Sequence, residues 1–209
     1  MDTDEFWQII DAARAQTGEE WWLGPGLVTD AFAQLPLAEI ADFAQVQEDL
    51  AWAAHREDVR TACRLINAGF GSTDVFVYFR QWLLVQGRAA FEAAMADPDT
   101  LLDVPGVAEM DPIATDEFAS CEAFLSVAND AWNRATGAPE PTIELDRFGF
   151  LVGDGDEVDG LEEELDRRGF DRWPEDKAAD EPIEFTDRAA VFAALPRLSA
   201  RFYDRAWRD

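Results

Sequence analysis

Hydrophobic residues recur at three- and four-residue steps along most of the chain, the spacing that places them on one face of an α-helix. Residues 4–15 show this spacing first, and Thr3 or Asp4 can cap the exposed amides there. The segment GEEWWLGPG (18–26) interrupts the spacing and is predicted to be a loop, with a short helix after it. Further helices are predicted over residues 37–54, 57–68, 74–96, 115–136, 159–168 and 187–207.

Glycine and proline refine these predicted helices. Gly69 is predicted to end one helix in the left-handed conformation, and the helix over 74–96 ends before Pro98. Gly87 lies inside that helix, where glycine costs about 1 kcal/mol relative to alanine, which predicts a close crossing by another element. Pro196 removes one helical hydrogen bond, so it must kink or split the last helical region.

The pattern of hydrophobic and polar residues changes after Gly137. GAPEPT (137–142) is typical of a linker, and the stretch 143–157 alternates enough to predict one strand pair with a glycine-containing turn. The sequence therefore predicts a mainly α fold: a compact multi-helix bundle over residues 4–137, with a short β-hairpin in the C-terminal third. We expect residues 138–209 to form an extension that packs on the first part.

The net charge of the chain limits the classes of molecule that we expect it to bind. The chain holds 44 acidic and 17 basic residues, a formal net charge of −27 that is spread over both halves. Such a field repels DNA, RNA and anionic membranes, so direct binding to nucleic acid or to a membrane is not expected. A basic segment of a protein partner suits the field, and mimicry of nucleic-acid charge is a weaker alternative. The interpretation without a partner is that the charge keeps the protein in solution.

Two cysteines, Cys63 and Cys121, lie far apart, each inside an apolar helical pattern. Neither has the CxxC spacing of a zinc or redox site, so both are expected to be small buried hydrophobic residues. No stretch reaches the roughly 18 apolar residues of a membrane span, and the first residues lack a basic region followed by an apolar run. The sequence thus favours a cytoplasmic location, and it predicts no cofactor.

The run YFRxWLxxQGRxxFExA (78–94) resembles the family known as domain of unknown function 4240 (DUF4240). The resemblance extends from DEFWQIIDAAR near the N-terminus to AWNRATG and covers about residues 4–137. It implies a compact bacterial helical domain, and it implies no established activity, cofactor or catalytic residue. Arg60 departs from the pattern, which leads us to expect an aromatic residue two positions after Asp58.

One predicted helix carries the first candidate site. Arg80 and Arg88 lie two turns apart on one flank of its apolar stripe, and two guanidinium groups there could grip a carboxylate or phosphate. Such an anion pocket would suit a small-molecule enzyme or sensor. In the other interpretation the two arginines pair with acids of neighbouring helices and hold the bundle in register. The opposite flank of the stripe adds Tyr78, Trp82 and Gln86 to the pocket hypothesis.

Polar residues at the turn before this helix form a second candidate. Asn67 and Asp74 bracket the turn, with Ser72 and Thr73 between them, and together they could line a polar cleft. Asp74 is also expected to cap the helix. The alternative is that these residues only satisfy helix ends and turn amides, the more frequent use of such side chains.

Two apparent motifs do not meet their own requirements. The stretch 152–166 looks like a calcium loop, but with Asp154 in first position the sixth is Asp159, where an EF-hand needs glycine. A weak cation site through these two residues and Asp156 is the minor alternative to a solvated turn, and we assign no metal site. His55 is the only histidine, so it cannot build a multi-histidine site, and it is predicted to lie at the surface near a helix end.

Adjacent tryptophans, Trp21 and Trp22, lie in the loop over 18–26. They could tuck over the end of the bundle, or they could form an exposed anchor for a protein partner, because tryptophan is enriched at binding hot spots. Both alternatives stay open on the sequence.

No recognisable catalytic constellation accompanies the uniform negative charge. We therefore expect a non-enzymatic binding or regulatory module that presents an acidic surface to basic segments of a protein partner. The alternatives are the arginine-lined anion pocket and, more weakly, nucleic-acid mimicry.

Overall fold

The computed structural model of the chain describes residues 1–18, 20, 24–115, 117–137, 160–169 and 183–206. Regular structure in these ranges is helical, with no strand among them, so the prediction of a mainly α fold is confirmed. The predicted hairpin over 143–157 lies outside the described residues. The α-helices are α1 (Thr3–Thr17), α2 (Gly24–Phe32), α3 (Leu37–Ala53), α4 (Glu57–Ile66), α5 (Thr73–Val85), α6 (Arg88–Ala96), α7 (Pro112–Thr115), α8 (Val127–Thr136), α9 (Gly160–Arg167), α10 (Arg188–Ala194) and α11 (Pro196–Phe202). The 3-10 helices include η2 (Pro98–Asp103), η3 (Val107–Glu109) and η4 (Glu122–Phe124).

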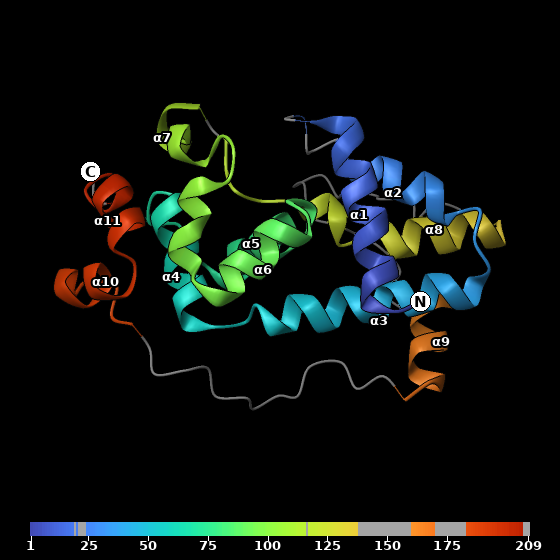
Figure 1. Cartoon of the computed structure of the whole chain (residues 1–209). Helices are drawn as coiled ribbons and strands as arrows, with labels where there is room; N and C mark the ends of the chain where they lie inside the picture. The colour runs from blue at the N-terminus through green and yellow to red at the C-terminus, as the bar shows by residue number, and fades with distance from the viewer. Residues whose placement is uncertain (19, 21–23, 116, 138–159, 170–182, 207–209) are drawn as a thin grey trace, which may run out of the picture.

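The helices gather in two groups around α5. At one end α1, α2, α3 and α8 pack on one another, and α9 lies against α3 and α8. At the other end α4, α6 and η2 lie together, and α11 packs on α4 and η2 with α10 beside it (Figure 1). Helix α9 and the pair α10 and α11 therefore lie at opposite ends of the first part of the chain.

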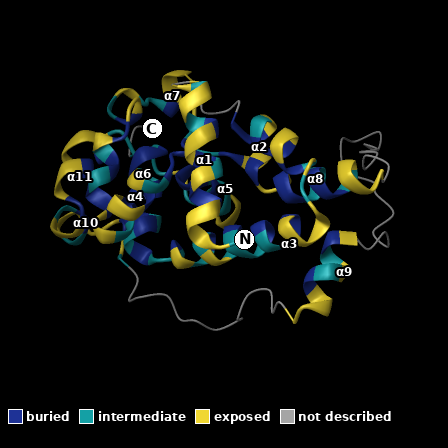
Figure 2. Cartoon of the chain, turned by 45° about the vertical axis from the view of Figure 1, so that its right-hand side comes forward, coloured by how far each residue is buried: buried dark blue, intermediate teal, exposed yellow. Residues whose placement is uncertain are grey.

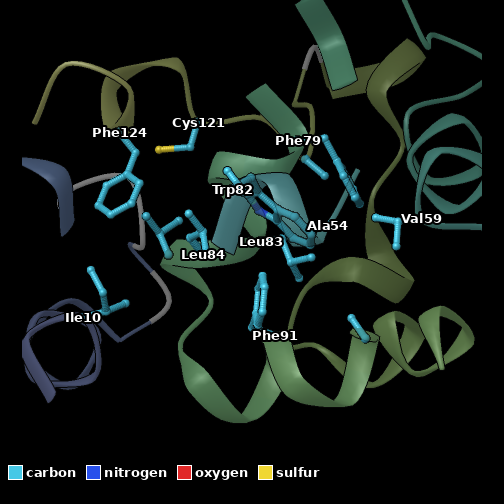
Figure 3. Packing of buried hydrophobic residues seen from close by; sticks show 14 of the residues in the cluster. Ile10, Ala54, Val59, Phe79, Trp82, Leu83, Leu84, Phe91, Cys121 and Phe124 are labelled. Atoms are coloured by element: carbon cyan, nitrogen blue, oxygen red, sulfur yellow. The ribbon is translucent and has the colours of Figure 1, made fainter. Parts of the chain in front are cut away.

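The centre of the molecule is α5, which contacts α1, α3, α4, α6 and η4. Every residue in the range Phe79–Val85 is buried, so this half of the helix is enclosed on all sides. In Figure 3 Leu84 lies on the side of Phe124, and Leu83 lies on the side of Phe91. Arg80 and Gln81 are buried there together with the apolar side chains, which places this half of α5 in the core.

The prediction of one continuous helix over 74–96 is wrong, because α5 ends and α6 begins around Gly87. Gly87 has a φ of +91°, and a Cβ at this position would lie 2.6 Å from the Asp11 carboxylate of α1. That carboxylate accepts the Arg88 N–H at 3.0 Å and so satisfies the first amide of a new helix. The close crossing at Gly87 is confirmed, but Arg80 and Arg88 belong to different helices.

The prediction of one helix over 115–136 is also wrong, because α8 covers only its second half. In the described residues 117–126 regular structure is limited to the 3-10 helix η4, and two backbone N–H groups before it bind other elements. The Cys121 N–H donates to the Tyr78 carbonyl at 3.0 Å, and the Ala119 N–H donates to the Asn67 side chain at 2.9 Å. Apolar spacing alone cannot report such long-range partners.

Two predicted boundaries are confirmed. Two residues with left-handed φ close α4, Ala68 (+53°) and Gly69 (+89°), and the Gly69 N–H donates to the Arg64 carbonyl at 2.7 Å. Pro196 is the first residue of α11 and separates it from α10, since proline is tolerated only where a helix starts. The predicted helix over 159–168 corresponds to α9.

Burial follows the expected amphipathic pattern. Figure 2 shows buried residues on the inward faces of the outer helices and exposed residues on their outward faces. Cys63 and Cys121 are free and buried, and burial raises the pKa of the Cys63 thiol to about 12 and of the Cys121 thiol to about 11. None of the described helices is long and apolar enough to span a bilayer.

Candidate functional site

Arg80 lies inside the core, where its exposure is 2%. From α5 its Nη1 donates to the carbonyl of Ala51 near the end of α3 at 2.9 Å, and its guanidinium carbon lies 5.2 Å from the centre of the Phe76 ring. Burial lowers the pKa of the Arg80 guanidinium to about 10. The negative charge of Glu48 acts against this shift, and the positive charge of Arg60 adds to it. Arg80 therefore ties α5 to α3 from within.

Arg88 lies at the exposed start of α6. Its Nη1 donates to the Asp4 carboxylate at 2.6 Å, and its Nε donates to Glu92 at 2.7 Å. These two carboxylates, Glu92 first, raise the pKa of the Arg88 guanidinium. Arg88 thus pairs with acids of α1 and of its own helix, whereas Arg80 reaches α3, so the two guanidinium groups reach different helices.

The other three residues predicted for this site do not all lie together. Trp82 is buried, and its Nε1–H has no hydrogen-bond partner among the described residues. Gln86 caps the end of α5, and its side-chain amide donates to the Trp82 carbonyl at 3.2 Å. Tyr78 lies nearer the surface, where its hydroxyl donates to Glu122 at 3.2 Å and this carboxylate raises the phenol pKa. Trp82 and Gln86 adjoin one another, and Tyr78 serves a different contact.

Asn67 is fully buried and holds a neighbouring segment in place. Its Oδ1 accepts the Ala119 N–H at 2.9 Å, and its Nδ2 donates to the Ala119 carbonyl at 3.4 Å. The expectation that Asp74 caps α5 is wrong, because the Ser72 hydroxyl accepts the Val75 N–H at 3.3 Å. Asp74 lies exposed in the first turn, where a negative charge favours the helix dipole.

Trp21 and Trp22 fall outside the described residues, as do the aspartates at 154, 156 and 159. The hypotheses of a tryptophan anchor and of a weak cation site therefore stay predictions. Within the ranges that the structure describes, no three His, Cys, Asp or Glu side chains are grouped to hold a metal ion.

A cluster around His55 could not be foreseen from spacing. The imidazole lies half-buried between α3 and α4, with its ring 4.9 Å from that of Trp52 and 5.6 Å from that of Phe76. Its Nε2 is 3.3 Å from Nη2 of Arg60, a guanidinium donor that needs an unprotonated nitrogen as its acceptor. Burial lowers the His55 pKa, and the positive charges of Arg80 and Arg60 lower it further. His55 does lie near a helix end, but it is partly enclosed.

The free energy of unfolding should fall as the pH drops below 6.5, the ordinary histidine value. Because the folded pKa of His55 is lower, the unfolded chain takes up a proton that the folded protein resists until the pH passes through the folded pKa. Burial raises the pKa of Glu57, so that group acts with the opposite sign at more acidic pH. Urea unfolding measured at several pH values below 6.5 should show that the free energy of unfolding depends less on pH in His55→Gln than in the wild type. An unchanged dependence would contradict the lowered pKa of His55.

Every arginine that the structure describes is engaged within the chain. Ion pairs to carboxylates hold Arg56, Arg60, Arg88, Arg134, Arg167, Arg168, Arg188, Arg197 and Arg205. Backbone carbonyls accept from Arg14, Arg80 and Arg201, and the guanidinium of Arg64 stacks on the Phe185 ring at 4.3 Å. Because the chain has 44 acids against 17 bases, the remaining carboxylates determine its surface potential.

A groove of about 490 Å³ between α1 and the start of α3 is one place where carboxylates gather. Glu5, Glu39 and Asp42 line it beside the apolar side chain of Ile9. Arg168, at the end of α9, already donates to Asp42 at 2.7 Å. This groove is therefore acidic but partly neutralised by the chain itself.

A second concentration of acids binds α11. We call residues 97–111 the acidic connection, because they include η2 and η3 and hold five carboxylates and no base: Asp97, Asp99, Asp103, Glu109 and Asp111. The Asp99 carboxylate is only 4% exposed and accepts the N–H groups of Arg197 and Leu198, each at 2.8 Å. A buried carboxylate thus satisfies two amides in the first turn of α11.

Arginines four residues apart continue this contact along α11. Arg197 donates to Asp103 through both Nη atoms, one of them at 2.8 Å, and holds the Asp103 pKa below its ordinary value. One turn later, Nε of Arg201 donates to the Ala108 carbonyl at 2.6 Å. The contact therefore advances along the acidic connection as the helix advances.

We call Arg197, Arg201 and Arg205 the arginine row, and this row ends in the turn after α11. Nη1 of Arg205 donates to the Met110 carbonyl at 2.9 Å and lies 3.8 Å from the Asp111 carboxylate. Leu198 and Phe202, each next to an arginine in the sequence, are buried beside the row. The arginine spacing and the run of acids were both readable in the sequence, but their pairing across about a hundred residues was not.

One of the comparisons with known proteins gives a match. Residues 1–134 match the family model described as protein of unknown function (DUF4240). No curated protein and no solved structure matches the chain. The matched range contains the acidic connection, whereas α9, α10 and α11 lie beyond it.

Proposed function

The chain belongs to the DUF4240 family of proteins of unknown function, and we propose that it is a non-enzymatic binding module for basic segments of a protein partner. The observation that carries the proposal is the engagement of every described arginine within the chain. Cationic side chains are thereby used internally, and the described carboxylates other than Glu57 and Asp99 are at least partly exposed.

Electrostatic attraction explains how such a surface selects a partner. A field of one sign draws an oppositely charged segment from a distance and raises its association rate. At physiological salt this attraction acts over about 8 Å, so local carboxylates and apolar contacts must fix the bound position. A regulatory role follows if the partner's basic segment is needed elsewhere, since the module then competes for it.

A cytoplasmic location is part of the proposal. The two cysteines are free and buried, and unpaired thiols are typical of proteins in reducing compartments. Their raised pKa values keep them in the thiol form near neutral pH, which suits structural residues rather than reactive ones.

The proposal is tested with two immobilised peptides of equal length, one rich in arginine and one with glutamine at the same positions. We expect the protein to be retained by the arginine peptide at about 50 mM salt and released at about 300 mM, because screening weakens exposed charge pairs. The glutamine peptide should retain little at either concentration. Failure of the arginine peptide to retain the protein, or retention that ignores salt, would count against the proposal.

A further inference from the structure

We infer that the acidic connection is a docking surface for an arginine-bearing amphipathic helix, and that α11 occupies it as a ligand built into the chain. The inference rests on the proposed function and specifies the basic segment that the module binds. The bound pattern is that of residues 197–205: arginine at every fourth position, with a large apolar residue directly after the first and second arginine.

The chemistry of the surface defines what an occupant must supply. Asp99 is almost fully enclosed, and both of its oxygens are used by amides of α11. A buried carboxylate without donors is strongly unfavourable, so a group that replaced α11 would have to supply equivalent N–H donors. The start of a helix provides them, because its first amides have no partner within the helix.

The geometry of the row sets the spacing of the ligand. Four residues advance a helix by about 6 Å and return to nearly the same face. Arg197 and Arg201 therefore lie on one side of α11 and meet Asp103 and the carbonyl at 108, and Arg205, in the turn after the helix, meets the carbonyl at 110. Lysine would fit less well, because only a guanidinium offers the two parallel donors that Asp103 accepts.

The division of the chain suggests that this occupant is replaceable. The surface lies within the family range 1–134, whereas its ligand lies outside it. The Arg197–Asp103 pair is exposed on both sides, with side-chain exposures of 48% and 63%, so water and salt weaken it. A helix of seven residues is also too short to be stable alone and forms only against its surface.

Occupation in cis has a regulatory consequence. A segment tethered to its own binding site acts at an effective concentration of about the millimolar range, so a partner helix must displace it. The C-terminal helices would then keep the surface closed until a partner of higher affinity arrives. A change that weakens the contacts of the arginine row should therefore open the surface to a partner.

The test uses the full-length protein and a labelled synthetic peptide of residues 183–206. The variant Arg197→Ala/Arg201→Ala/Arg205→Ala should release the built-in helix, and we expect it to bind the peptide at least about tenfold more tightly than the wild type. Arg134→Ala, which removes an exposed pair to Asp30 on another face, should behave like the wild type. Adding Asp103→Ala to the triple variant should weaken the gain.

Equal binding of the peptide to wild type and triple variant would overturn the inference but not the proposed function, which is judged on the unrelated arginine and glutamine peptides. Absence of binding to a folded triple variant would overturn it as well.

Hydrogen exchange on the wild type keeps the inference testable if the triple variant does not fold. Amides of Arg197 and Leu198 should exchange through local opening, faster than the enclosed amides of α5. Exchange of both groups only on global unfolding would show that α11 does not detach, and the inference would fail.

Discussion

Replacing Asp99 with alanine should lower the free energy of unfolding by about 3 kcal/mol. The change removes both oxygens that accept the N–H groups of Arg197 and Leu198, and these amides then lie at a helix start with no acceptor. Hydrogen bonds to a charged group contribute more than neutral ones, and burial of Asp99 removes the compensation by water. Urea unfolding followed by circular dichroism measures the loss.

Asp187 provides a matched control for this substitution. Its Oδ1 caps α10 by accepting two amides at 3.0 and 3.1 Å, so this carboxylate also satisfies two amides of a helix start, but in an exposed setting. Asp187→Ala should cost only about 1 kcal/mol, as for an ordinary helix cap. Equal losses of stability in the two variants would contradict the claim that burial strengthens the contribution of the Asp99 hydrogen bonds.

Arg80→Ala should be comparably severe, with an expected loss of about 3–4 kcal/mol. The substitution leaves the Ala51 carbonyl without its donor and opens space beside Phe76 in the core. The measurement is again urea unfolding, with the denaturation midpoint and slope determined together.

Arg88→Ala is the comparison for Arg80→Ala. The Arg88 side chain pairs with acids at the surface, where ion pairs add little to stability, so its midpoint should match the wild type. If Arg80→Ala also left the midpoint unchanged, the structural assignment of Arg80 would be wrong, and a binding role for this residue would deserve new tests.

The hypothesis of an anion pocket between these two arginines finds no support in their surroundings. Arg80 faces a backbone carbonyl inside the core, and Arg88 faces the carboxylates of Asp4 and Glu92. An incoming anion at Arg88 would have to compete with two acids already in place. We therefore do not propose a small-molecule enzyme.

Periodic spacing predicted the helices because burial of an apolar face is a local property of the sequence. Residues 37–53 and 57–66 became helices close to the predicted limits, and Pro196 split the last helix as its missing N–H requires. The break at Gly87 was not predictable in the same way, since its cause is the Asp11 carboxylate of another helix. Glycine indicated a close approach, and only the structure shows that the approach ends the helix.

The candidate sites show the same limit. Arg80 and Arg88 share a flank only on a continuous helix, so the break that separates them also separates the predicted site. The contact of Asp99 with α11 joins positions about a hundred residues apart, and neither a run of acids nor a row of arginines names its partner. Local patterns indicated which residues were unusual, and long-range packing decided what they contact.

The most direct test of the account is to map where an arginine-bearing helical peptide binds, from backbone amide shifts of the full-length protein. We expect the largest changes in the acidic connection and in α11, because the peptide replaces the built-in helix there. Changes confined to the groove between α1 and α3, with α11 unaffected, would contradict the account.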